Sequence, residues 1–217
     1  MPKTSILIAD DHKIVRDGVR ALVATVPEWE IVAEADNGRD AVALVEKLQP
    51  DVAILDLTMP GLNGLDATRQ IKKRFPQVEV LIFTGTETED LIHDVFASGA
   101  RSYIVKADQT SQLLEAIRTV ARHKHFFTSR IGEIVFARYT QSEKARKESA
   151  ETGQLTERER EIVQLLAEGK SNKEVAATLG ISVKTAETHR AAIMRKLGFK
   201  AFSELVRYAI RNKMIEP

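Results

Sequence analysis

The sequence predicts a doubly wound α/β domain with a five-stranded parallel, flavodoxin-like sheet, followed by a small all-α domain of four helices. In the first half, short apolar runs of strand length alternate with longer segments whose apolar residues recur at helical spacing. Acidic residues directly follow two of these runs, at the edge where open α/β sheets bind ligands. Residues 152–217 show only helical periodicity, interrupted by glycines.

The first domain is expected to span residues 1–127. We expect strands at 5–9, 30–35, 52–56, 78–84 and 102–105, and helices at 15–26, 38–48, 65–75, 87–98 and 111–122. Pro27 and Pro76 end the first and third helices, and Gly99 ends the fourth. The predicted strand order is 2-1-3-4-5, which places the first and third strands side by side.

Composition limits the classes of function. The chain has 217 residues and no cysteine, which excludes disulfides, thiolate catalysis and cysteine-ligated metals. No apolar run is long enough for a membrane span, and Asp10 comes too early for a signal peptide, so we expect a cytoplasmic protein. Residues 1–127 hold 15 Lys/Arg against 19 Asp/Glu, whereas residues 152–217 hold 12 against 8. An acidic front and a basic tail indicate different partners.

Three carboxylates are expected to meet at one edge of the sheet. Asp10 and Asp11 follow the first strand, and Asp56 ends the third. Asp56 alone would equally suit a turn cap, because Asx turns are common. Acids that converge in a cleft repel one another, and Mg²⁺, which prefers hard oxygen ligands, relieves that repulsion.

Two further residues suit such a site. Thr84 ends the fourth strand before Gly85, and Lys106 ends the fifth. A hydroxyl and an ammonium group beside carboxylates can bind phosphoryl oxygens. Each residue alone is more often structural or solvated, and only the combination indicates a phosphoryl site.

These motifs resemble the receiver domain of bacterial two-component response regulators over residues 4–122. The matching residues are Asp10-Asp11, Asp56 with Met59-Pro60-Gly61 and Gly64, Thr84-Gly85, and Tyr103 three residues before Lys106. Gly85 stands where the family more often has Ala, and Ala107 where it often has Pro.

The resemblance implies a role for each matching position. Asp56 would accept a phosphoryl group from a sensor histidine kinase or a phosphotransfer protein. Asp10, Asp11, Asp56 and the backbone carbonyl of Thr58 would hold Mg²⁺. Thr84 and Lys106 would contact the phosphoryl oxygens, and Tyr103 would be a rotamer switch.

Residues 128–151 are expected to form a linker, partly helical and then flexible, because residues 141–154 lack apolar periodicity. His123 and His125 stand just before it, without further His or Cys nearby. We therefore expect surface residues rather than metal ligands.

Residues 152–217 predict a helix-turn-helix module. Capping boxes at Thr156–Glu159 and Ser171–Glu174 each start a helix, and Gly180 ends the second. We expect a third helix at 183–197 and a fourth at 201–212. The third is basic, which suits major-groove binding, although basic helix faces are usually only solvated.

Three motifs of this module resemble the LuxR-type DNA-binding domain. They are Leu155-Thr156-Glu157-Arg158-Glu159, Gly169 to Ala176, and Ser182-Val183-Lys184-Thr185 with His189 and Lys196-Leu197-Gly198. The whole chain thus resembles the NarL/FixJ family of response regulators.

That resemblance implies double-stranded DNA as a partner and a homodimer upon phosphorylation, formed through the last helix. The base-facing positions would be Glu187, Thr188 and Ala191. The phosphate contacts would come from Lys184, Thr185, His189, Arg190, Arg195 and Lys196.

Two other classes of function share some of these residues. A phosphohydrolase of the haloacid dehalogenase type also uses an aspartate nucleophile, but needs a second acid two residues later, where this chain has Thr58. A receiver that signals without phosphorylation would be a pure binding module, and the full set of acid, Thr and Lys positions argues against it.

Overall fold

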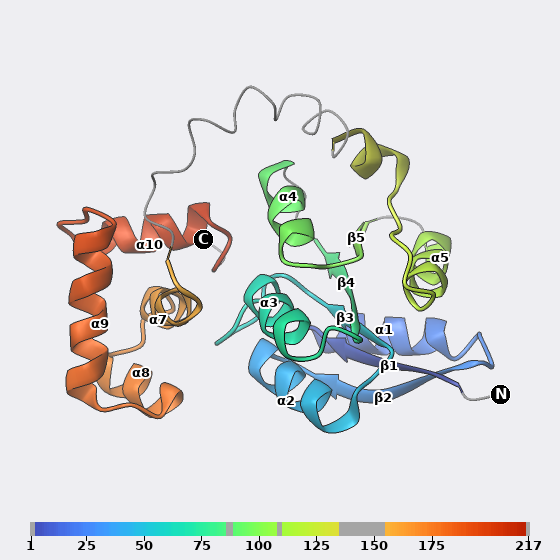
Figure 1. Cartoon of the computed structure of the whole chain (residues 1–217), viewed down its shortest axis with the longest axis horizontal. Helices are drawn as coiled ribbons and strands as arrows, with labels where there is room; N and C mark the ends of the chain where they lie inside the picture. The colour runs from blue at the N-terminus through green and yellow to red at the C-terminus, as the bar shows by residue number, and fades with distance from the viewer. Residues whose placement is uncertain (1–2, 86–88, 108–109, 135–154, 216–217) are drawn as a thin grey trace. The chain divides into compact units, whose positions relative to one another are not determined.

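The computed structural model describes residues 3–85, 89–107, 110–134 and 155–215. The chain divides into two compact units, residues 1–143 and 144–217, which are described separately here (Figure 1). The expected boundaries near residues 127 and 152 remain predictions, because residues 135–154 lie outside the described part.

The first unit contains a five-stranded parallel sheet in the order β2-β1-β3-β4-β5, so the predicted strand order is confirmed. Its strands are β1 (Thr4–Ala9), β2 (Trp29–Ala35), β3 (Val52–Leu55), β4 (Glu79–Thr84) and β5 (Ser102–Val105). Its helices are α1 (Lys13–Val23), α2 (Gly38–Leu48), α3 (Gly64–Arg74), α4 (Glu89–Ala97) and α5 (Thr110–Val120).

Helices cover both faces of this sheet (Figure 1). One buried apolar cluster joins the sheet to α2, α3 and α4, and a second joins the opposite face to α1 and α5. Leu7 and Ile8 illustrate the alternation, because these neighbours on β1 belong to different clusters. The central strand β3 is buried along its whole length, which explains its continuous apolar sequence.

Several element ends differ from the sequence-based expectations. Helix α1 ends at Val23 rather than near Val26, because the residue before Pro27 cannot comfortably stay helical. Strand β3 ends at Leu55, so Asp56 stands just beyond it. Leu48, the last residue of α2, is apolar yet 40% exposed.

The second unit packs four helices around one apolar cluster (Figure 1). They are α7 (Glu157–Ala167), α8 (Asn172–Leu179), α9 (Val183–Lys196) and α10 (Phe202–Arg211). Both expected capping boxes form, at Thr156–Glu159 and Ser171–Glu174. Gly180 ends α8 with a φ of 64°, a left-handed conformation that glycine adopts without strain.

Within the expected linker, residues 129–134 of the first unit are helical, and residues 135–151 lie outside the described residues. Among the described helices, none combines the length and apolar character needed to span a lipid bilayer.

Candidate functional site

The carboxyl ends of neighbouring strands bring the acidic residues together. In the parallel register, Ala9 of β1 lies opposite Leu55 of β3. The ladder continues one residue further, because the Asp56 amide donates to the Ala9 carbonyl at 2.8 Å. Asp10 and Asp56 therefore leave adjacent strands at the same level of the sheet.

An acidic cluster results at this edge. Ligand atoms of Asp10, Asp11, His12 and Asp56 all lie within 4.8 Å of one another. Asp10 and Asp56 are buried, with 2% and 4% of their surface exposed, whereas Asp11 and His12 face solvent. Three hard carboxylate donors at this separation fit a divalent cation such as Mg²⁺.

Lys106 lies across the two buried acids. Its Nζ donates to Asp10 Oδ2 at 2.7 Å and to Asp56 Oδ2 at 3.0 Å. Burial would lower the pKa of Lys106, but the hydrogen bond to Asp10 and the charge of Asp56 outweigh it and raise that pKa. The ammonium group therefore stays charged and serves two carboxylates at once.

Burial, together with a neighbouring acid, disfavours the charged form of Asp56. Burial raises the pKa of Asp56, and the nearby Asp10 raises it further, although Lys106 and the Leu57 amide oppose both effects. The Leu57 amide donates to Asp56 Oδ1 at 2.8 Å and fixes the carboxylate plane. Such a carboxylate gains from any added positive charge, which suits a nucleophile that works beside a metal.

Other candidate residues lie at the end of β4 and in the loop after β3. Thr84 is buried at the end of β4, and its carbonyl accepts from the Lys106 amide at 2.7 Å, so both residues belong to the same edge. An added Cβ on Gly85 would meet nothing within 4 Å, so space is open there. Thr58 is half-buried in the loop after β3, two residues beyond Asp56.

Tyr103 differs in position from the other candidates. Its side chain is wholly buried in the cluster that joins the sheet to α2, α3 and α4. It lies opposite Ile82 on β4, while Thr84 lies opposite Val105. Tyr103 and Thr84 therefore lie two register positions apart on neighbouring strands.

The loop after β3 explains one glycine of the motif. A Cβ added to Gly64 would lie 1.9 Å from the carbonyl oxygen of Asp56. Any side chain there would push the phosphoacceptor candidate out of place. This close approach is a physical reason for Gly64 that the turn pattern alone did not reveal.

Sequence reasoning missed two residues of this site. His12 Nδ1 lies 2.8 Å from Asp11 Oδ1 and 3.4 Å from Asp10 Oδ1. Arg16 donates to the Asp10 carbonyl at 2.6 Å, one helical turn along α1. In the sequence, the only indication was that His12 and Arg16 follow the acid pair closely. The turn into α1 is what brings these two side chains back toward the acids.

Helix α9 presents an open face in the second unit. Lys184, Glu187, Thr188, Ala191 and Arg195 are all exposed and recur at helical spacing. Ala186 and Ile193, on the opposite side, are buried in the core. The basic helix is therefore available to a groove rather than enclosed.

The remaining DNA candidates are partly engaged within the unit. Lys196 Nζ bonds Glu159 Oε2 of the α7 capping box at 2.7 Å. The guanidinium of half-buried Arg190 lies 5.1 Å from the centre of the Phe202 ring. Thr185 shares a 2.8 Å hydrogen bond with the Ser182 hydroxyl at the helix start, and His189 is half-buried.

Two family models match the chain. The response regulator receiver domain matches residues 6–118, and the LuxR family of bacterial regulatory proteins matches residues 153–209. Each match lies within one of the two compact units.

Known proteins resemble the chain along its whole length. The oxygen regulatory protein NreC of Staphylococcus epidermidis is 40% identical over 217 residues, covering 97% of this chain and 99% of that protein. NreC of Staphylococcus aureus is 38% identical with the same coverage.

Solved structures agree with these relatives. An RcsB response regulator in complex with DNA is 26% identical with a TM-score of 0.59, over 95% of this chain and 97% of that one. A LuxR-family two-component response regulator from Aurantimonas is 30% identical with a TM-score of 0.61, over 64% of this chain and 99% of that one.

Proposed function

Because the chain belongs to the response regulators that join a receiver domain to a LuxR-type helix-turn-helix domain, we propose that phosphorylation of Asp56 controls its binding to DNA and hence transcription. We assign residues 1–127 to the receiver, 128–151 to a linker and 152–217 to the DNA-binding domain. The protein acts in the cytoplasm and turns over no substrate beyond its own phosphoryl group.

The phosphoryl transfer follows from the surroundings of Asp56. A carboxylate oxygen of Asp56 forms a new P–O bond while the P–N bond of a phosphohistidine donor breaks, and the donor imidazole recovers its electron pair. Lys106, already 3.0 Å from Asp56 Oδ2, offsets negative charge on the phosphoryl oxygens. Hydrolysis of the acyl phosphate by water would restore the carboxylate.

The acidic cluster fits Mg²⁺ by its donor set. Asp10, Asp11 and Asp56 supply carboxylate oxygens, and the Thr58 carbonyl would complete the protein ligands. When bound, Mg²⁺ supplies positive charge that lowers the repulsion between the incoming phosphoryl group and these acids. These residues would hold the ion and orient Asp56 toward the donor.

The switch rests on Thr84 and Tyr103. A phosphoryl group replaces one negative charge at Asp56 with roughly two and adds acceptor oxygens. The Thr84 hydroxyl would donate to one of them, and Tyr103, on the adjoining strand, would respond to that movement. The Tyr103 side chain is completely buried, so any other rotamer would have to leave its present contacts in the core. The buried rotamer and that other rotamer would be the two states of the switch.

The DNA contacts rest on the open face of α9. Glu187 would accept from a cytosine amino group, Thr188 would contact a base edge, and Ala191 would offer a methyl contact. Lys184 and Arg195 on the same face would bind phosphates, with Thr185, His189, Arg190 and Lys196 beside them. A dimer on two half-sites, formed through α10, would strengthen binding by a domain with modest net charge.

One observation carries the proposal: the ends of three different strands deliver Asp10, Asp56 and Lys106 into direct hydrogen-bond contact. Incubation with radiolabelled acetyl phosphate should label the protein, and Asp56→Asn should abolish the labelling. Asp36→Asn is the matched control, because Asp36 is an exposed acid directly after β2 at the same edge.

A label that persists in Asp56→Asn at the wild-type level would refute the assignment of Asp56. Equal DNA affinity with and without phosphoryl transfer would refute the coupling between the two domains while leaving the phosphoacceptor assignment intact.

A further inference from the structure

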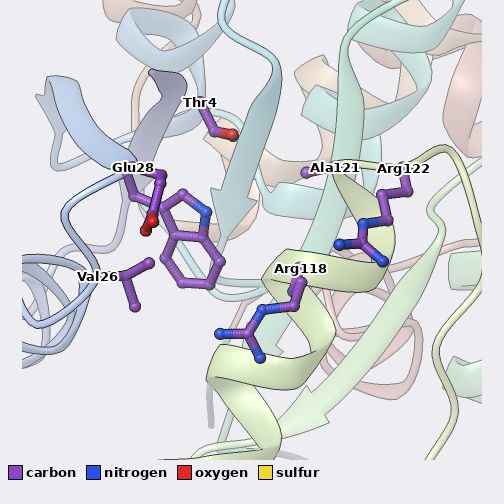
Figure 2. Close-up of a pocket in the computed structure, with 7 residues that line it drawn as sticks. Thr4, Val26, Glu28, Arg118, Ala121 and Arg122 are labelled. Carbon is purple, nitrogen blue, oxygen red and sulfur yellow. The ribbon is translucent and has the colours of Figure 1, made fainter. Parts of the chain in front are cut away.

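A pocket of about 410 Å³ lies at the opposite edge of the receiver sheet from Asp56. Two of its residues, Thr4 and Trp29, begin β1 and β2, whereas Asp10 and Asp56 of the acidic site follow the carboxyl ends of β1 and β3. It is lined by Thr4, Val26, Glu28, Trp29, Arg118, Ala121 and Arg122 (Figure 2). Its volume is that of a site for a small molecule.

Two arginines form one side of this pocket. Arg118 is in the last turn of α5 and Arg122 lies in the turn that follows this helix, and both side chains line the pocket (Figure 2). Neither has a carboxylate partner among the described residues. A guanidinium group can bind a carboxylate through two parallel hydrogen bonds. Because Arg118 and Arg122 lack such a partner in the described part of the chain, this side of the pocket carries positive charge.

An aromatic surface completes the site. The guanidinium carbon of Arg118 lies 5.6 Å from the centre of the Trp29 ring. Trp29 is 8% exposed, so most of its indole is buried and only a small part of its surface is open to the pocket. Stacking on Trp29 limits the freedom of Arg118 before any ligand arrives, which reduces the entropy lost on binding.

Glu28 limits the charge of the ligand. It lies across the pocket from the arginines and also has no ion-pair partner among the described residues (Figure 2). Its carboxylate repels a second negative group, so a monoanion suits the pocket better than phosphate or a dicarboxylate.

We propose that this pocket binds a small planar monocarboxylate, with its carboxylate between Arg118 and Arg122 and its planar part against Trp29 and Val26. The site is separate from the phosphoryl site and does not depend on Asp56. It adjoins the end of α5, from which the chain continues toward the second domain.

The test uses the only tryptophan of the chain as its reporter. Trp29 fluorescence is followed while full-length protein is titrated with benzoate, acetate, inorganic phosphate or chloride at constant ionic strength. Benzoate should give a saturable change, acetate a weaker one, and phosphate and chloride none. Absence of saturation with benzoate, or an equal response to phosphate, would overturn the proposal.

Variants distinguish benzoate binding in this pocket from a general effect of charge on the protein surface. Arg118→Ala/Arg122→Ala should weaken benzoate binding roughly tenfold or more, as expected for loss of a charge-assisted pair. Glu28→Gln should tighten it, and Lys124→Ala, an exposed cation outside the lining, should leave it unchanged. Because Arg118 touches the reporter, calorimetric titration measures the same affinities independently of fluorescence.

Unchanged benzoate affinity in the double arginine variant would contradict the proposal. Self-association through the pocket would also contradict the proposal. It would appear as a Trp29 fluorescence change that depends on protein concentration in the absence of benzoate, together with loss of benzoate binding at high protein concentration.

Discussion

Two buried carboxylates at opposite edges of one sheet have opposite electrostatic surroundings. Asp56, after β3, has a raised pKa because burial and Asp10 outweigh the single ammonium group of Lys106. Glu79, at the start of neighbouring β4, is 2% exposed and is bonded by Lys72 at 3.1 Å, Arg101 at 2.9 Å and His123 at 2.8 Å. Burial would raise the pKa of Glu79, but these hydrogen bonds lower it to about 2.

The difference separates a structural acid from a functional one. At Glu79 the cations are in excess, and the carboxylate joins α3 and β4 to Arg101, just before β5, and to His123, which follows α5. At Asp56 the acids are in excess, so the site is completed only by an added cation or by chemistry at the carboxylate. We infer that a buried acid with surplus cations stabilises the fold, whereas one with surplus acids performs the function.

The largest expected effect comes from removing each charge in turn. Glu79→Gln should lower the free energy of unfolding by about 3 kcal/mol, because Lys72 and Arg101 would lose their common partner in a partly buried place. Asp56→Asn should lower the free energy of unfolding by less than about 1 kcal/mol or raise it, since a neutral amide removes the repulsion between Asp56 and Asp10. Urea unfolding followed by Trp29 fluorescence reports on the receiver alone.

Glu46→Gln is the control for these two amide substitutions. Its ion pair with Arg74 is exposed, so its loss should cost well under 1 kcal/mol. The comparison fails if Glu79→Gln and Asp56→Asn destabilise the receiver equally.

The pH dependence should differ in sign between the two acids. The folded pKa of Glu79 is lowered from 4.5 to about 2, so its contribution of about 3 kcal/mol is present above pH 4.5 and is lost as pH falls toward 2. The folded pKa of Asp56 is raised, so its ionised form destabilises the receiver as pH rises above the unfolded value of 3.8.

Unfolding curves across acidic pH check both signs. Glu79→Gln should flatten the rise of stability between pH 2 and 4.5, and Asp56→Asn should remove a decline above 3.8. If the free energy of unfolding of Glu79→Gln rose between pH 2 and 4.5 as steeply as that of the wild type, Glu79 would not be the acid that causes this rise.

Lys106 tests the functional side of the comparison. Lys106→Gln leaves Asp10 and Asp56 without their shared cation and should raise the pKa of Asp56 further. Labelling by acetyl phosphate should slow by roughly tenfold to a hundredfold, because positive charge beside the phosphoryl oxygens is lost. Carbon-detected NMR titration of the Asp56 carboxyl and labelling rates give the two measurements, and Lys13→Gln, an exposed cation on α1, is the control.

The smallest expected effect extends the comparison to α9. Lys184 is exposed and has no ion-pair partner among the described residues, whereas Lys196 is bonded to Glu159. Lys184→Ala should weaken binding to all DNA sequences several-fold and lower the slope of log affinity against log salt concentration by about one phosphate contact. Lys196→Ala should have a smaller effect on both quantities. Gel shifts at several salt concentrations that rank the two variants in the reverse order would contradict this account.

Much of the architecture follows from local sequence. Strict alternation of strands and helices predicted the sheet and its strand order, and the ends of parallel strands then placed Asp10, Asp56 and Lys106 at one edge. Capping boxes located the starts of α7 and α8 to the residue. These signals are encoded within a few residues and need no tertiary contact.

Other features depend on residues that meet only in the folded chain. His123 was expected to be a plain surface residue; its side chain is 66% exposed, yet it bonds a buried carboxylate that lies 44 positions earlier. Glu79 itself stands within an apolar strand, where no local pattern indicates its cations. The pocket beside Trp29 joins the starts of two strands to the end of α5, and no periodicity encodes that meeting.

The central claim is that Asp56 is the acid that receives the phosphoryl group. Borohydride reduces an acyl phosphate to an alcohol, so treatment of phosphorylated protein followed by peptide mass spectrometry locates the modified acid. We expect conversion of Asp56 to homoserine, with Asp10, Asp11 and Asp36 unchanged. Conversion at any of those other acids, with Asp56 intact, would contradict the account.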